Sequence, residues 1–336
     1  MKNKNRAGLS FFLKMLLGLL TGLGAFMGVG YGFFSQFIYV DRKKKMKPPF
    51  FFKLKETSSN HPADRYHYAF SEGKKWCEEQ TTEDFQIVSQ DGLSLHASYL
   101  RTESPERILI LCHGFKGAGF GDFAFISRFL HENHCNLLYI DERSCGKSEG
   151  NYITFGAKES QDIRDWADFI VKQDGGNLPV YLYGMSLGAS SVVMAGGLEL
   201  PDQVKGIIDD CGYYSMESAI RGVAENWFHI KHIRPLLFIM NFYCRIFAGF
   251  SMDEACTKKA LGKNTRPMLF FHGSTDTFVN PADTRWNYSL CRAPKELVII
   301  KGAKHLCSCY ADSQLYERKL MEFFGKYDKA LQKYGF

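Results

Sequence analysis

Ser186 has the sequence context of an activated nucleophile. It is the central residue of Gly184-Met185-Ser186-Leu187-Gly188, which fits the pattern G-x-S-x-G. Apolar residues 180–183 predict a buried strand before it, and the small, apolar residues 189–198 predict a helix after it. So sharp a turn strains the serine backbone and favours glycine at positions 184 and 188. We therefore predict a nucleophile elbow whose serine hydroxyl attacks a carbonyl carbon.

A candidate acid and a candidate base follow Ser186 in the chain. Asp276 lies in a loop after apolar residues 268–271, and His305 lies in a loop after apolar residues 297–300. Histidine, with an ordinary pKa near about 6.5, can take the serine proton at neutral pH. Asp276 would hold the imidazole in the right tautomer. Asp209 and Asp210, after an earlier strand, are the alternatives for the acid.

Acyl transfer also needs two hydrogen-bond donors for the oxyanion. The backbone N–H of Leu187 follows the nucleophile, and the N–H of Phe115 lies in the loop that begins His113-Gly114. We predict that these two groups form the oxyanion hole, with His113 bracing its loop. This chemistry requires no cofactor and no metal, and we predict neither.

These residues must be positioned by strands that alternate with helices. Such alternation predicts a mainly parallel sheet covered by helices on both faces, which is an α/β fold. An antiparallel hairpin with an Asp91-Gly92 turn is expected at its start. The predicted strands, eight in number, cover residues 85–89, 93–100, 108–112, 137–140, 180–183, 206–208, 268–271 and 297–300. The predicted helices cover residues 66–79, 122–131, 157–171, 189–198, 281–290 and 313–324.

From residue 85 to its end the chain resembles the α/β-hydrolase superfamily. The resemblance is strongest to membrane-anchored bacterial members near the monoacylglycerol-lipase-like and prolyl-peptidase-like branches. It implies an α/β-hydrolase fold with serine-hydrolase chemistry, and the order serine, aspartate, histidine matches that fold. The matching stretches are His113–Phe115, Asp141–Ser148, Tyr152–Gly156, Gly184–Gly188, Gly206–Gly212, His272–Asp276 and Gly302–His305.

Residues 212–264 form an insertion that we predict to be a helical lid. Arg234-Pro235 can open a helix and Gly249 can end it. The residues between are apolar nearly all round, so protein, substrate or lipid must cover them. One prediction places Phe238, Phe242 and Ile246 above Ser186, where they would select apolar acyl chains. The alternative is a lid helix that only packs on the rest of the domain.

The N-terminal region predicts a single membrane-spanning anchor. Residues 15–40 carry no charge and exceed the roughly 20 residues that cross a bilayer. A cleaved signal peptide is the alternative, but its apolar core is usually shorter and ends at a small-x-small cleavage site. Residues 1–14 are a basic flank, and residues 41–84 are a linker with a capping helix. More basic residues follow the span than precede it, which favours a cytoplasmic catalytic domain. Gly18, Gly22, Gly24, Gly28 and Gly32 share one helical face, which predicts a homodimer through the anchor.

Composition excludes other classes of protein. The formal charge of +6 is concentrated beside the apolar N-terminal run, so we predict no nucleic-acid partner. The ten cysteines are scattered, which indicates buried thiols and not a disulfide framework. Cys307 and Cys309 form a close pair, but no second pair completes a zinc site.

The sequence therefore predicts a membrane-anchored serine hydrolase that cleaves carboxylic esters with an apolar acyl chain through an acyl-enzyme. A thioesterase, a peptidase or an acyltransferase with the same triad are the alternatives among enzymes. An inactive hydrolase fold that serves as a binding module at the membrane is the alternative from another class.

Overall fold

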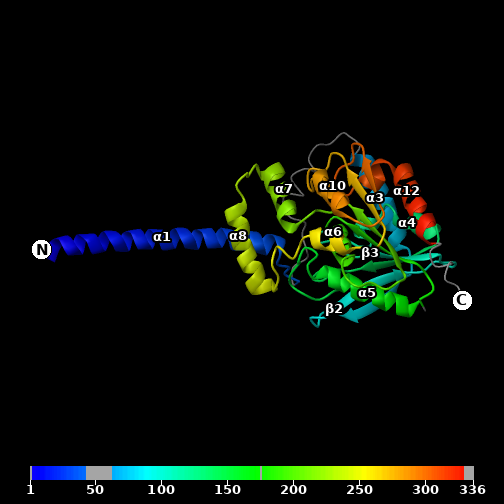
Figure 1. The fold of residues 1–336 in the computed structure, drawn as a ribbon, viewed down its shortest axis with the longest axis horizontal. Coiled ribbons are helices and arrows are strands. Elements are labelled where there is room, and N and C mark those ends of the chain that lie inside the picture. Colours follow the sequence, from blue (N-terminus) through cyan, green and yellow to red (C-terminus); the bar gives the residue numbers. More distant parts are fainter. Residues whose placement is uncertain (1, 43–62, 175, 329–336) are drawn as a thin grey trace.

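The computed structural model describes residues 2–42, 63–174 and 176–328, and the predicted linker at residues 43–62 lies outside this part. Its centre is a sheet of eight strands in the order β1-β2-β4-β3-β5-β6-β7-β8 (Figure 1). Strand β2 runs opposite to the other seven strands and pairs antiparallel with β1 and β4, as the predicted hairpin requires. The strands are β1 (Glu83–Val88), β2 (Ser94–Leu100), β3 (Arg107–Cys112), β4 (Cys135–Ile140), β5 (Val180–Met185), β6 (Val204–Asp210), β7 (Met268–Gly273) and β8 (Lys295–Ile300). The predicted mainly parallel α/β sheet is confirmed.

Successive side chains of each strand point to opposite faces of the sheet. Each face therefore has an apolar core of its own, and helices cover both. Ile108, Ile110 and Cys112 of β3 face one core, and Leu109 and Leu111 face the other. The first core is closed by α5 (Glu159–Gln173), α6 (Leu187–Ala195), α9 (Lys258–Lys263) and α10 (Pro281–Leu290), and the second by α4 (Ser127–Glu132) and α12 (Ser313–Tyr327).

The predicted helix over residues 122–131 forms only in part. The segment begins with the 3₁₀ turn η1 (Gly121–Phe123), and α4 starts at Ser127. The predicted capping helix is α3 (Ala63–Glu78), which packs on α4. A Cβ at Gly73 would lie 2.1 Å from the Ala124 carbonyl oxygen, so the two segments meet backbone to backbone. A short helix α11 (Ser308–Ala311) precedes α12.

Helix α1 (Lys2–Phe37) extends away from the domain, and only its last turns are packed on it (Figure 1). Within the described part of the chain, no helix is both long and apolar enough to cross a membrane. The predicted anchor over residues 15–40 is therefore not supported by the structure. Phe34, Phe37, Ile38 and Val40, at the end of that range, are buried in protein. The predicted cytoplasmic location stays a prediction.

The chain after α1 is fastened to the domain by backbone hydrogen bonds. The N–H of Ile153 donates to the carbonyl of Ile38 at 2.9 Å, and the N–H of Val40 donates to the carbonyl of Asn151 at 2.8 Å. These bonds fix residues 38–40 beside the loop that follows β4. The end of α1 is therefore an integral part of the domain.

The insertion at residues 212–264 contains α7 (Met216–Phe228), α8 (Arg234–Tyr243), the single π-helical turn η2 (Cys244–Ala248) and α9. The predicted stop at Gly249 is confirmed, since this residue has φ +67° and caps the turn. Helix α8 crosses α1 (Figure 1). Together α1, α7 and α8 build a third apolar cluster above the sheet, separate from its two cores.

Gly30 allows α1 and α8 to cross closely. A Cβ at Gly30 would lie 2.2 Å from Cγ2 of Ile239 in α8, which is far inside contact distance. Gly18, Gly22, Gly24, Gly28 and Gly32 have no such neighbour within 4 Å. The homodimer predicted through these five glycines stays a prediction. Gly30, which makes the close contact with α8, lies outside the helical face that these five glycines share.

All ten cysteines lie in the described part of the chain, and all are free thiols. Eight are buried, and Cys256 and Cys307 are partly buried. This agrees with the prediction of buried thiols.

We predict that Gly30→Leu loosens the packing of α1 on α8, because the new side chain overlaps Ile239. Overpacking of this kind costs about 1–3 kcal/mol. The melting temperature should fall and protease should cleave α1 from the domain faster. Gly28→Leu is the matched control, since nothing lies within 4 Å of that position. Equal effects of the two substitutions would contradict the assigned crossing.

Candidate active site

The turn between β5 and α6 has the geometry of a nucleophile elbow. Ser186 has φ +55° and ψ −111°, a conformation that is strained for a residue with a side chain. A Cβ at Gly184 would lie 2.2 Å from the carbonyl of Gly188, and a Cβ at Gly188 would lie 2.0 Å from the carbonyl oxygen of Cys112. Glycine is therefore required at both positions because backbone lies where a side chain would be.

The structure brings the three predicted triad residues into one chain of hydrogen-bond contacts. His305 Nε2 lies 2.9 Å from Ser186 Oγ, and His305 Nδ1 lies 2.7 Å from Asp276 Oδ2. Ser186 and Asp276 are buried, and His305 is partly exposed. In this arrangement the imidazole can accept the serine proton while the carboxylate stabilises the resulting cation.

Asp276 is held as a carboxylate by several donors. The backbone N–H groups of Phe278 and Val279 donate to its Oδ1 at 2.8 and 3.0 Å. Burial by itself raises the pKa of Asp276, but the charge of His305 and hydrogen bonds from His272 and His305 outweigh it. The pKa therefore lies below its usual value, and the group is ionised at neutral pH.

His272 is a second histidine on Asp276, and the sequence analysis gave it no role. Its Nε2 lies 3.1 Å from the same Oδ2 that His305 contacts, and its Nδ1 lies 2.6 Å from Thr284 Oγ1. Burial lowers the pKa of His272, but its contact with Asp276 outweighs burial and leaves the pKa raised. His272 belongs to β7 and Asp276 to the loop that follows, so the signal in the sequence was a histidine four residues before the aspartate.

The alternative acids do not contact His305 in the structure. Asp209 accepts a hydrogen bond from the N–H of Gly212, and burial raises its pKa to about 7. Asp210 accepts from the hydroxyls of Ser308 and Tyr316, and burial raises its pKa as well. Of these three carboxylates, Asp276 is the one that lies at hydrogen-bond distance from the imidazole of His305.

The loop predicted to supply Phe115 N–H lies directly against the nucleophile. A Cβ at Gly114 would lie 3.3 Å from Ser186 Cβ, and the Gly114 N–H donates to Asp122 Oδ2 at 2.6 Å. His113 braces the loop, since its Nδ1 lies 2.8 Å from the Gly114 carbonyl and its Nε2 accepts from Glu142 N–H. Leu187 is the first residue of α6, so its N–H has no partner within the helix.

The end of α1 is tied to this same loop. Lys116, with φ +58°, donates from Nζ to the carbonyl of Gln36 at 2.9 Å, and its ammonium lies 5.1 Å from the centre of the Phe115 ring. Burial lowers the pKa of Lys116. The rings of Phe37 and Phe115 lie 6.3 Å apart. The N-terminal segment therefore packs on the predicted oxyanion loop.

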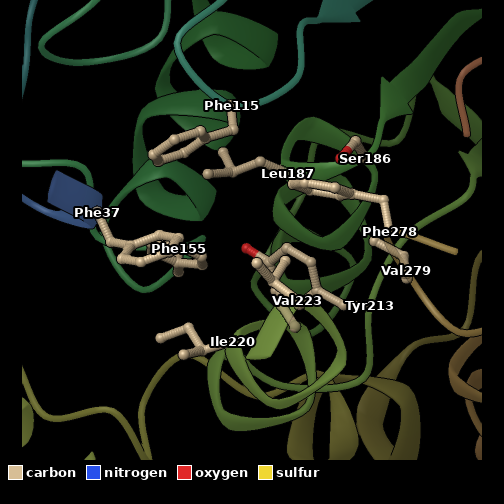
Figure 2. Close-up of a pocket in the computed structure, with 11 residues that line it drawn as sticks. Phe37, Phe115, Phe155, Ser186, Leu187, Tyr213, Ile220, Val223, Phe278 and Val279 are labelled. Atoms are coloured by element: carbon tan, nitrogen blue, oxygen red, sulfur yellow. The ribbon is translucent and has the colours of Figure 1, made fainter. Parts of the chain in front are cut away.

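An apolar pocket opens at Ser186 (Figure 2). About 380 Å³ there is free of protein atoms, a volume that includes space open to solvent. Apart from Ser186 and Tyr213, the described residues that line it have apolar side chains. They are Phe37, Phe115, Phe155, Leu187, Ala219, Ile220, Val223, Phe278 and Val279. Residues 219, 220 and 223 belong to α7, and Phe37 belongs to α1.

The prediction that Phe238, Phe242 and Ile246 lie above Ser186 is wrong. Their side chains are 77%, 47% and 58% exposed, and none of them lines the pocket. Helix α8 instead turns Leu237 and Met240 toward the protein. The reason is that α7 and the end of α1 already occupy the space above Ser186.

One group of possible metal ligands exists among the described residues. Cys211, Asp276 and His305 have ligand atoms within 4.8 Å of one another. Asp276 and His305 already form hydrogen bonds within the chain that ends at Ser186, and the Cys211 thiol is buried, with its pKa raised by burial. This donor set suits proton transfer, and no cofactor is needed for the acyl transfer it supports.

Comparison with known proteins agrees with this geometry. Residues 103–230 match the model of the serine aminopeptidase S33 family. The chain is 23% identical to Bacillus subtilis YqkD over 92% of this chain and 96% of that protein. It is also 23% identical to Salmonella typhimurium YfhR over 67% of this chain and 74% of that protein.

Solved structures with a similar fold include an esterase, the protein Est1E and a peptidase. The Pyrococcus furiosus esterase Pf2001 has a TM-score of 0.60 at 18% identity, covering 84% of this chain and 98% of its own. Est1E from Butyrivibrio proteoclasticus, bound to ferulic acid, has a TM-score of 0.54 at 20% identity. The match covers 72% of this chain and 98% of Est1E. A Pyrococcus horikoshii acylaminoacyl peptidase has a TM-score of 0.55 at 15% identity. The match covers 76% of this chain and 44% of the peptidase. These likenesses show the fold, which is that of the α/β hydrolases.

We predict that Asp276→Asn lowers kcat/KM for an activated ester by about 10⁴-fold, because an amide cannot stabilise the imidazolium. Circular dichroism should show an intact fold. Asp209→Asn is the matched control at the alternative acid, and its kcat/KM should stay within about tenfold of the wild type. The opposite ranking of the two variants would reassign the acid.

Proposed function

We propose that the protein is a serine hydrolase that cleaves carboxylic esters with an apolar acyl group. The observation that carries this proposal is the hydrogen-bonded chain Ser186–His305–Asp276 at the mouth of an apolar pocket. Ser186 Oγ attacks the ester carbonyl while His305 Nε2 takes the hydroxyl proton. The N–H groups of Leu187 and Phe115 would receive the oxyanion.

The second half of the reaction uses the same groups. The bond between the carbonyl carbon and the alcohol oxygen breaks, and His305 returns its proton to the departing alcohol. Water then attacks the acyl-enzyme, with His305 as base, and releases the carboxylic acid and free Ser186. Loss of either oxyanion donor typically costs about 10²–10³-fold in kcat.

The pocket favours an ester over the substrate of an aminopeptidase. An enzyme of that kind must bind a free ammonium group beside the scissile bond, which requires an acidic or strongly polar group. The described lining residues include no carboxylate, and their only polar side chains are those of Ser186 and Tyr213. An apolar acyl chain matches such a wall, since burying it releases roughly 0.8 kcal/mol per CH₂.

A thioesterase or an acyltransferase would use the same triad and the same acyl pocket. They differ in the leaving group and in the acceptor, which bind outside the acyl pocket. An inactive binding module has no need for His305 between Ser186 and Asp276 at hydrogen-bond distance. The intact proton path therefore favours an enzyme.

Labelling with a fluorophosphonate tests the proposal directly. The wild-type protein should become covalently labelled at Ser186 and should hydrolyse p-nitrophenyl esters. Ser186→Ala and His305→Ala should lose both properties and keep the wild-type melting temperature within a few degrees. A folded wild-type protein that is neither labelled nor active on any ester would refute the proposal and favour the binding module.

We expect Phe37→Ala to enlarge the acyl pocket. The ring of Phe37 is buried and lines the wall opposite Ser186, so its removal makes room for longer chains. The optimum along a series of p-nitrophenyl esters from acetyl to dodecanoyl should move to longer chains. Short-chain esters should lose about 3- to 30-fold in kcat/KM because their packing is lost.

The control for this variant is Phe238→Ala in α8. Its side chain is exposed and does not line the pocket, so the chain-length profile should stay that of the wild type. If Phe238→Ala moves the optimum and Phe37→Ala does not, the predicted lid selects the substrate and the N-terminal helix only packs.

A further inference from the structure

The insertion presents an apolar surface that the domain leaves uncovered. Phe238, Phe242 and Ile246 of α8 and η2 are exposed, and their spacing of four residues places them on one side of the helix. These three residues are called the α8 stripe below. The opposite side carries Leu237 and Met240, which are buried in the apolar cluster above the sheet. The α8 stripe therefore points away from the domain.

Helix α1 continues past this surface. The Tyr243 hydroxyl donates to the carbonyl of Met27 at 3.2 Å, and Ile239 packs where a side chain of Gly30 would be, so α8 lies across α1 here. Figure 1 shows α1 going on beyond α8, away from the sheet. Whatever covers the α8 stripe therefore lies next to the part of α1 that precedes Met27.

That part of α1 exposes large apolar side chains over most of its circumference. They belong to Leu17, Leu20, Leu23, Phe26 and Val29. At about 100° per residue, these five positions spread over about 240° around the helix axis. A docked protein covers one side of a helix, whereas lipid can cover every side. This arrangement favours lipid over a protein partner as the neighbour of the α8 stripe.

The charge around the α8 stripe is positive. Residues 226–252 contain no Asp or Glu, and residues 1–40 contain none either. Lys231, Arg234 and Arg245 are exposed, and none of them forms an ion pair among the described residues. Arg234 lies four residues before Phe238, and Arg245 lies three residues after Phe242, so both arginines border the stripe. Aromatic and aliphatic side chains bordered by basic ones suit the surface of an anionic bilayer.

We propose that the α8 stripe docks on an anionic lipid surface. Phe238, Phe242 and Ile246 enter the boundary between headgroups and acyl chains, and Arg234 and Arg245 contact lipid phosphates. Docking of this kind needs no helix that crosses the membrane. It also does not depend on the proposed ester hydrolysis, so the two proposals can fail separately.

The experiment measures flotation of the full chain with phosphatidylcholine vesicles, with or without about 30 mol% phosphatidylglycerol. The wild-type protein should bind the anionic vesicles more tightly, and salt should weaken this binding. Phe238→Asp combined with Phe242→Asp should weaken binding at least about tenfold, because two aromatic side chains no longer enter the lipid. Helix α1 is unchanged in this double variant, so the loss reports the α8 stripe.

Matched controls separate the α8 stripe from general surface effects. Trp286 is a large exposed side chain on α10, and Trp286→Asp should leave vesicle binding unchanged. Lys231→Gln combined with Arg234→Gln should weaken binding to anionic vesicles about fivefold for each charge removed and should not affect neutral vesicles. Lys258→Gln combined with Lys259→Gln removes the same charge from α9 and should have a smaller effect.

The substituted side chains are exposed, so each variant should keep the melting temperature of the wild type. If the double variant unfolds, Phe238→Asp alone, at the most exposed position of the stripe, decides the question. A wild-type protein that does not bind anionic vesicles would overturn the proposal, and so would equal losses in the stripe variant and Trp286→Asp. A lipid-free dimer that the stripe variant disperses, with vesicle binding unchanged, would assign the stripe to a second copy of this chain.

Discussion

The structure depends on the close approach of three backbone segments around Ser186. The carbonyl of Cys112 at the end of β3 lies where a side chain of residue 188 would be, and the backbone of Gly188 lies where a side chain of residue 184 would be. Larger residues at these positions would push α6 off β3 and β5. The serine backbone could then relax from its positive φ, and its hydroxyl would no longer project toward His305. The order of strands in the sheet matters because it delivers β3, β5 and β6 to this point.

A second constraint comes from a distant part of the sequence. The end of α1 closes the pocket through Phe37 and contacts the predicted oxyanion loop through Gln36 and Lys116. Helix α8 crosses α1 at Gly30. The N-terminal helix and the insertion therefore form one structure over the sheet, and the shape of the pocket is set by their mutual packing. The pocket is therefore lined by residues from separate regions of the chain.

The sequence was most informative where a motif follows a strand. Ser186, Asp276 and His305 each come directly after an apolar run, so the sheet had to place them at one edge. The sequence could not decide which aspartate contacts His305, because Asp209 and Asp210 also lie at the end of a strand. Phe37 was not predicted to line the pocket because it belongs to a long, mostly apolar run, and burial in lipid and burial in protein look alike in a sequence. The sequence did not show which face of α8 is exposed, because that depends on how α8 packs on α1, a distant segment of the chain.

The sheet order has one further consequence. Strand β8 is the last strand at its edge and pairs only with β7, and the loop that carries His305 hangs from its end. The other two members of the triad come from strands with a neighbour on each side. Edge elements open more readily than central ones, so His305 is carried by one of the two parts of the sheet that open most readily. Fraying of this margin would separate the imidazole from Ser186 while the two cores stay packed. Loss of the proposed activity and global unfolding would then be separate events, and the activity could return without refolding of the whole domain.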